Sequence, residues 1–280
     1  MGQTVASHVF ADAPYRLSFG AAFQKALRFG APLTANGLGL AVAAQGDRLL
    51  VGALLGPEAL GLYVVAMLAV LVPVTLVQRM MGALCGAALY NSGGDRTETL
   101  RRIARAAPAV GAFYACGGLA FANTLVALAF GPRFVLPSLG LALLCAAALL
   151  RIARAEPFTS LLLLDRRTKE AALGNLSAWA GLLVSAGLML AHPGVESALF
   201  GRALGEAIAL SVTFSLTRPM LGAAAADFAK ALAFACLLTL IASLPVPGAP
   251  TALVCAALAA AALTRILIRG EAPARVGAAP

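Results

Sequence analysis

The sequence predicts an all-α fold, a polytopic transmembrane helical bundle of about eight spans with both termini in the cytoplasm. Of the 280 residues, 61% are hydrophobic and 12% are charged, and the mean hydropathy is +0.89. A soluble domain of this length does not have such a composition, whereas a multi-span membrane protein does. The net charge of +9 does not indicate nucleic-acid binding, because the basic residues form no face interleaved with aromatic side chains.

Residues 1–28 are predicted to form a cytoplasmic N-terminal segment. The opening residues show no basic head followed by an apolar core, so we expect no cleaved signal peptide. Residues 15–29 combine apolar and basic side chains in the pattern of an amphipathic helix, and a helix of this kind lies in the membrane interface. It would lead the chain into the first span.

Eight apolar segments follow, each close to the about 20 residues that a helix needs to cross a bilayer. Turn residues such as Gly56-Pro57 and His192-Pro193-Gly194 separate neighbouring segments. The predicted spans are residues 31–55, 59–79, 107–130, 135–163, 171–191, 198–216, 228–244 and 251–268.

The basic residues outside the spans lie almost entirely on one side of the membrane. With both termini on that side, it receives fifteen lysines and arginines, and the opposite side receives only Arg133. Because loops rich in lysine and arginine stay in the cytoplasm, this side is cytoplasmic. We therefore expect a multi-pass membrane protein with both termini in the cytoplasm.

Apart from Lys230 and Arg265, which are assigned to the cytoplasmic ends of their spans, eight charged residues lie inside the predicted spans. A charge there is costly and almost always faces protein or water. The eight are Asp47, Arg48, Arg79, Arg151, Arg154, Glu156, Arg202 and Glu206. One interpretation is a set of buried ion pairs that only holds helices together. The interpretation that we favour is a polar path through the membrane, lined first by Asp47 and Arg48 on the hairpin around Gly56.

Helical spacing predicts how several of these residues are arranged. In the first span, Asn36 shares a helical face with Asp47. Arg202 and Glu206 are four residues apart and can pair along one helix. Arg79 lies near the cytoplasmic end of its span, where it either snorkels to the lipid headgroups or lines the cavity.

The fourth span allows two interpretations. Arg151 and Arg154 share one helical face, and Pro157, which follows them, favours a kink. Either one long helix covers residues 135–163, or a span ends near Leu150 and an interfacial segment follows. We favour the long helix, because the apolar run continues to a clear basic turn.

Neither enzymatic activity nor a bound cofactor is expected. The five cysteines lie in apolar spans without a CxxC pair and the two histidines are far apart in the sequence, which argues against zinc and redox sites. The sequence also lacks a Walker motif, a nucleophile elbow and an HExxH helix. We therefore expect no catalytic residue, no metal and no cofactor.

The first hairpin resembles a known family. Its sequence, FGAPLTANGLGLAVAAQGDRLLVGALLGPEALGLYVVA, is similar to the start of the second lobe of polysaccharide flippases, the O-antigen and teichoic-acid exporters of the multidrug/oligosaccharidyl-lipid/polysaccharide (MOP) superfamily. Residues 165–175 and 192–206 are also similar to family segments, so the resemblance covers about residues 22–220. The positions that match the family pattern in the hairpin are Pro32, Asp47, Arg48, Gly52, Gly56, Gly61 and Tyr63.

The resemblance implies a division of the chain. Residues 29–220 would form a six-helix transporter lobe, residues 221–270 two additional transmembrane helices, and residues 271–280 a cytoplasmic tail. Family members have two such lobes with the substrate cavity between them, and this sequence resembles only the second.

The resemblance therefore implies a partner. A separate chain with the first lobe, or a second copy of this chain, would complete the cavity; a truncated remnant is the third possibility. Contact with the partner would run along the first two spans, where the pairs Gly52/Gly56 and Gly82/Gly86 permit close approach of helices.

The resemblance also implies a function, the flipping of a lipid-linked, anionic oligosaccharide or polysaccharide precursor across the inner membrane by alternating access. Arginine binds such phosphates well, so Arg48, Arg151 and Arg154 would contact the anion, with Asp47 orienting Arg48. The alternatives are a non-transporting membrane scaffold of a glycan-synthesis complex and half of a cation-coupled multidrug exporter. The excess of arginines over acids inside the spans disfavours the exporter.

Reporter fusions test the predicted topology. Fusions after Glu170 and after Arg275 should report the cytoplasm, and fusions at Pro132 and Gly194 the periplasm, because of the asymmetry of the basic residues. A periplasmic C-terminus would contradict the eight-span prediction.

Overall fold

A computed structural model gives the fold and describes residues 20–92, 96–244 and 249–269. In this part of the chain every regular element is a helix, which confirms the predicted all-α class. The predicted tail at 271–280 and most of the segment 1–28 lie outside the described residues. The elements are α2 (Ala21–Tyr90), α3 (Arg96–Phe130), the short 3₁₀ helix η1 (Pro132–Phe134), α4 (Ser138–Ala155), α5 (Phe158–Leu164), α6 (Thr168–Leu176), α7 (Trp179–Ala191), α8 (Val195–Leu221), α9 (Ala224–Ser243) and α10 (Ala249–Arg269).

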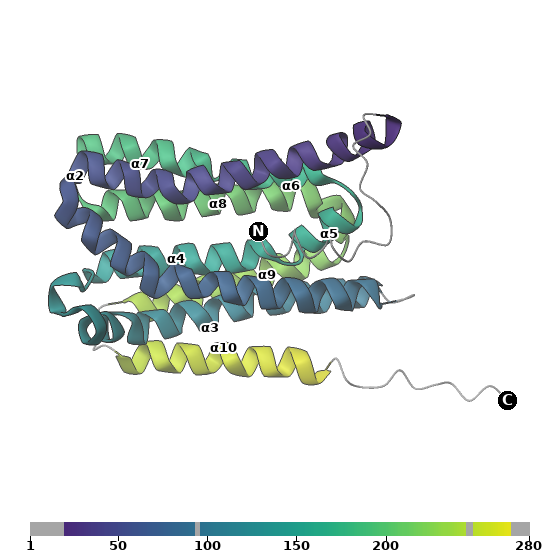
Figure 1. Ribbon diagram of the computed structural model, residues 1–280. Helices are drawn as coiled ribbons and strands as arrows, with labels where there is room; N and C mark the ends of the chain where they lie inside the picture. The colour runs from purple at the N-terminus through teal and green to yellow at the C-terminus, as the bar shows by residue number, and fades with distance from the viewer. Residues whose placement is uncertain (1–19, 93–95, 245–248, 270–280) are drawn as a thin grey trace, which may run out of the picture.

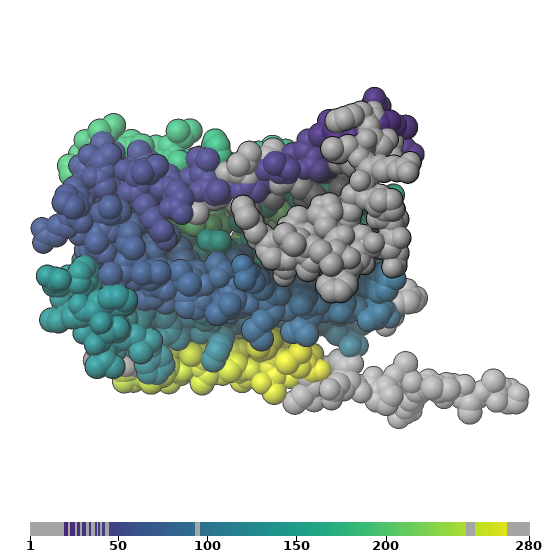
Figure 2. Space-filling model, viewed as in Figure 1, coloured from purple at the N-terminus to yellow at the C-terminus, as the bar shows by residue number. Residues whose placement is uncertain are grey.

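The helices form two layers (Figure 1). The first arm of α2, residues 21–55, lies in one layer with α6, α7 and α8. The second arm, residues 57–90, lies in the other layer with α3, α4, α9 and α10. α4 lies against α8 and joins the two layers. α10 packs on α3 and α9 and forms one edge of the molecule (Figure 2).

Gly56 reverses the chain within α2. Its backbone has φ 88° and ψ 177°, a conformation with positive φ that glycine adopts without the steric penalty of a side chain. The two arms run antiparallel (Figure 1), and Leu60 of the second arm lies 3.1 Å from the position that a Cβ on Gly52 would take. The hairpin predicted around Gly56 is therefore confirmed, and Gly52 packs within this hairpin.

Seven segments among the described residues are long and apolar enough to cross a membrane. The first of them, Gln45–Tyr90, contains the turn at Gly56, so the predicted spans 31–55 and 59–79 both lie in α2. Large apolar side chains point outward, with Leu128 85% and Leu183 74% exposed, as expected of helices whose outer face meets lipid. The chain is a multi-pass membrane protein.

The fourth span is interrupted, which corrects the prediction of one long helix over 135–163. α4 ends at Ala155, the backbone of Glu156 is extended, and α5 begins at Phe158. Pro157 accounts for the break, because proline has no amide hydrogen to donate and its ring clashes with the preceding helical turn. Both helices still belong to one apolar segment of 27 residues, Ser138–Leu164.

Glycines bring α7 and α8 into close contact. A Cβ on Gly181 would lie 2.7 Å from the amide nitrogen of Gly205 and even closer to the carbonyl oxygen of Gly201. A Cβ on Gly205 would lie 2.7 Å from the carbonyl oxygen of Ala178. Residues without side chains are needed at such a crossing, because they let two helix backbones touch directly.

The substitution Gly181→Ala should lower the free energy of unfolding by about 1–3 kcal/mol, because the new methyl group would overlap backbone atoms of α8. Gly187→Ala is the matched control in the same helix, since a Cβ there would have no neighbouring atom within 4 Å. Thermal unfolding of the purified protein in detergent measures both variants. Equal melting temperatures would show that α7 and α8 are not in contact at Gly181.

Candidate functional site

Four charged side chains meet where the two layers join, and we call them the buried charge network. Asp47 comes from the first arm of α2, Arg154 from α4, and Arg202 and Glu206 from α8. The exposed fraction is 5% for Asp47, 8% for Arg154 and 4% for Glu206, and 11% for the side chain of Arg202. The network therefore lies in the interior of the bundle.

Each member of the network contacts an opposite charge. Arg202 binds Asp47 Oδ2 through Nη1, and its Nη2 lies 3.8 Å from Oε1 of Glu206. Oε2 of Glu206 accepts a hydrogen bond of 3.2 Å from Nη2 of Arg154. Two carboxylates thus face two guanidinium groups, and each buried charge has the partner that it needs to offset its desolvation.

Two neutral side chains complete the network. Tyr63, on the second arm of α2, donates a hydrogen bond of 3.2 Å to Oδ2 of Asp47. Asn175, on α6, accepts a hydrogen bond from Nη1 of Arg154. The network therefore ties both arms of α2 to α4, α6 and α8. Neither side chain was a predicted site residue, because no local pattern connects Asn175 or Tyr63 to a distant charge.

The pairing of Asp47 differs from the prediction. The expectation that Asp47 orients its neighbour Arg48 is wrong, because Asp47 pairs with Arg202, which is 155 residues away in the sequence. Successive residues of a helix point in different directions and do not face each other. The predicted pair Arg202/Glu206 along α8 is present at 3.8 Å.

Arg48 and Arg151 are intramembrane bases without an ion pair to another described residue. Both are half-buried, and Nε of Arg48 is buried without a hydrogen-bond partner in the described part of the chain. Arg151 lies within electrostatic reach of Arg154, Arg202 and Glu206. Because the network itself is balanced, these two arginines supply the excess positive charge of the interior.

The other predicted site residues are not part of the network. Arg79 is exposed, the position expected of an arginine that snorkels. Glu156 is 4% exposed and lies at the break between α4 and α5, where its Oε2 has no hydrogen-bond partner among the described residues. Oε1 of Glu156 is 3.4 Å from the position of a Cβ on Gly82, so Gly82 faces the break between α4 and α5 of its own chain. The side chain of Asn36 is outside the described part of the structure.

A pocket of about 390 Å³ with a basic lining opens at the end of the bundle that is predicted to be cytoplasmic. Five of its seven lining residues are basic, and Glu170 is acidic. These bases were predicted only to orient the chain and, in the case of Lys25 and Arg28, to form the polar face of an amphipathic helix. Nothing in the sequence shows that residues 25–28 meet residues 166–169. The lining residues are Lys25, Arg28, Arg166, Arg167, Thr168, Lys169 and Glu170.

The chemistry offered by these side chains is the binding of anions. No three side chains that could hold a metal ion come together within the described ranges of the chain. Guanidinium groups bind phosphate and carboxylate through paired hydrogen bonds. The site can therefore bind an anion at Arg48 and Arg151, and its ion pairs can exchange partners.

Arg154→Leu should lower the free energy of unfolding by about 3–5 kcal/mol, because it removes the closest counter-charge of the buried Glu206. The double variant Arg154→Leu/Glu206→Leu should recover most of this loss, since it leaves neither charge of the pair behind. Arg218→Leu, at an exposed position on α8, is the control. The melting temperature in detergent measures all three, and a single variant as stable as the control would show that the network does not stabilise the fold.

Comparison with known proteins agrees with the resemblance seen in the sequence. Residues 2–136 of the 280-residue chain match the family model described as polysaccharide biosynthesis protein. No curated protein and no solved structure gives a significant match. The matched region includes the α2 hairpin and, within it, Asp47, Arg48 and Tyr63. Over residues 2–136 the chain is therefore similar to the polysaccharide biosynthesis proteins, and its resemblance to their family is confirmed for this region.

Proposed function

We propose that the protein is a transporter lobe that helps to flip a lipid-linked, anionic oligosaccharide or polysaccharide precursor across the bacterial inner membrane. The similarity of residues 2–136 to polysaccharide biosynthesis proteins supports a role in making or exporting such a glycan. The multi-pass fold suits a substrate that must cross the bilayer, and a lipid-linked sugar carries its negative charge on phosphate.

The observation that carries the proposal is the positive charge of the interior. Arg48 and Arg151 lie at membrane depth without an ion pair to a described residue. Charges at this depth are rare, and those that line a cavity mark a path for a ligand or ion. An anionic phosphate supplies the partner that both arginines lack. A cationic drug would be repelled by them, which disfavours the exporter of cationic drugs.

The basic pocket supports entry of the substrate from the cytoplasmic end. It lies at the predicted cytoplasmic end, and five basic side chains line it. Clustered positive charge raises the local concentration of an anionic ligand. In this proposal the phosphate of the precursor first meets this pocket and then reaches Arg151 in the interior.

The buried charge network offers a mechanism for alternating access. Its ion pairs join the two layers, because Glu206 on α8 binds Arg154 on α4. A phosphate can replace a carboxylate as the partner of an arginine, since both accept paired hydrogen bonds. Binding of substrate at Arg154 would thus weaken the link between α4 and α8 and let the layers separate.

A second transporter lobe remains part of the proposal, as a separate chain or a second copy. In the sequence, the reason to expect a partner is the resemblance to only one of two lobes, and the structure adds a reason of its own. Asp47, Arg202 and Glu206 are covered within the chain, so they need no partner to shield them. The half-buried Arg48 is the intramembrane base of α2 that a facing lobe would enclose.

The balance of the network favours a second candidate, a membrane scaffold of a glycan-synthesis complex. Two of the intramembrane arginines, Arg154 and Arg202, are neutralised by acids of the same chain. Buried ion pairs of this kind can serve only to fix helix positions. A scaffold would need them intact and would make no use of Arg48 and Arg151.

Arg48→Leu and Arg151→Leu should each reduce glycan export about tenfold or more in a strain that depends on the gene, because each removes a charged hydrogen-bond donor for the phosphate. Arg79→Leu, which changes an exposed arginine of α2, should export normally. Complementation is measured together with the amount of folded protein in the membrane. Normal export by both interior variants would reject the flippase lobe and favour the scaffold.

A further inference from the structure

We propose that the cytoplasmic ends of α3 and α10 bind the headgroup of an anionic membrane phospholipid, with an acyl chain in the adjoining groove between α2, α3 and α10. This lipid site is distinct from the buried charge network and from the basic pocket beside α6. It does not depend on the proposed transport function.

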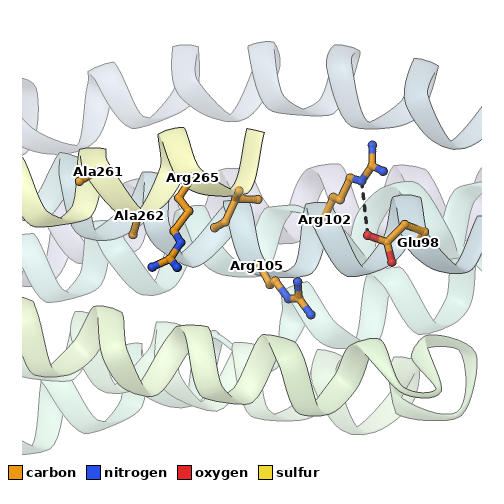
Figure 3. Close-up of a pocket in the computed structure, with 7 residues that line it drawn as sticks. Glu98, Arg102, Arg105, Ala261, Ala262 and Arg265 are labelled. Carbon is orange, nitrogen blue, oxygen red and sulfur yellow. Dashed lines mark hydrogen bonds and ion pairs between the residues drawn. The ribbon is translucent and has the colours of Figure 1, made fainter. Parts of the chain in front are cut away.

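The headgroup pocket lies between α3 and α10 (Figure 3) and has a volume of about 620 Å³. Three arginines and one glutamate line it, together with small and apolar residues of α10. Figure 3 shows Arg102 beside Glu98, and Arg105 and Arg265 along the same stretch of the two helices. The pocket therefore has an excess of positive charge.

The arginines of this pocket are available to a phosphate to different degrees. Arg265 is exposed and has no ion pair among the described residues. Arg102 lies 3.4 Å from Glu98 on its own helix, and Arg105 lies 3.1 Å from Asp227 on α9. Exposed ion pairs contribute little free energy, so a phosphate can readily take over Arg102, whereas Arg105 is held more closely by Asp227.

An apolar groove adjoins the headgroup pocket. It has a volume of about 390 Å³ and is lined by apolar side chains such as Leu84, Ala106 and Leu263, with Arg102 at its rim. Arg102 and Ile266 line both the groove and the headgroup pocket. Along α3 the groove extends from Arg102 to Val110, about 12 Å at 1.5 Å per residue.

The order of charge and apolar surface matches a phospholipid of the cytoplasmic leaflet. Arg102 and Arg265 belong to the basic side of the topology, at the level of the headgroups. Val110 lies further along α3 and therefore deeper in the membrane. Basic pockets between transmembrane helices on the cytoplasmic side bind anionic headgroups, and an acyl chain needs the apolar surface directly below. Charge complementarity selects an anionic lipid over a zwitterionic one.

Native mass spectrometry of the delipidated full chain, titrated with phosphatidylglycerol or phosphatidylcholine, tests the proposal. Phosphatidylglycerol should bind more tightly. The variant Arg102→Gln/Arg265→Gln should weaken its binding roughly 25-fold, because each basic residue near the membrane surface contributes about a factor of five. Arg218→Gln/Lys230→Gln removes the same charge from exposed positions on α8 and α9 and should leave the affinity unchanged.

Filling the groove tests the part of the site that belongs to the acyl chain. Ala106→Phe should weaken the binding of phosphatidylglycerol although all arginines are present. If this variant does not fold, Ala88→Phe, at an exposed position of α2 in the same groove, replaces it. Inorganic phosphate should compete only weakly, since it lacks the chain.

Four results would overturn the proposal. Equal binding of the two lipids, or unchanged binding by Arg102→Gln/Arg265→Gln, would exclude headgroup recognition. Unchanged binding by the groove variants, with full competition by inorganic phosphate, would leave a phosphate site only. A dimer that forms in place of lipid binding and is lost in the groove variants would assign the groove to a second copy.

Discussion

A single buried network of charges joins the two layers of helices, and the placement of the central helices depends on it. Asp47, Arg154, Arg202 and Glu206 come from three helices and are almost fully removed from the surface. An ion that loses its partner in such surroundings costs far more free energy than the intact pair contributes. Apolar packing alone is less selective, because lipid chains offer the same contacts to a helix as another helix does.

The structure separates charges that hold the fold from charges that are available to a ligand. Apart from Lys230 and Arg265 at the cytoplasmic span ends, the spans contain five arginines and three acids, and the simplest interpretation is a uniformly positive interior. In the structure, two arginines are balanced by Asp47 and Glu206. The remaining positive charge is concentrated at Arg48, at Arg151 and in the cytoplasmic pocket. An anion would therefore meet positive charge at defined positions rather than along the whole path.

Irregular backbone supports the network. Pro157 ends α4 just after Arg154, so the chain turns into α5 and then α6, which brings Asn175 back to Arg154. Gly56 reverses α2, which brings Tyr63 to Asp47. In both places a residue with unusual backbone properties returns a polar side chain to a charge that the preceding helix has buried.

The all-α class, the membrane spans and the turn at Gly56 could be predicted from the amino-acid sequence. These features depend on hydropathy and on residues that are neighbours along the chain, so a local pattern suffices to predict them. The candidate site residues could also be identified, since a charge inside an apolar span is unusual whatever its partner is.

Only the tertiary structure decided which charges pair. Arg202 is 155 residues from Asp47, and Glu206 is 52 residues from Arg154. Any arginine in a span could have met either acid as far as hydropathy and helical spacing are concerned. The convergence of residues 25–28 with residues 166–169 has the same origin. Ion pairing depends on the distance between two side chains in space. Helix packing fixes that distance, and a local sequence pattern carries no information on how helices pack.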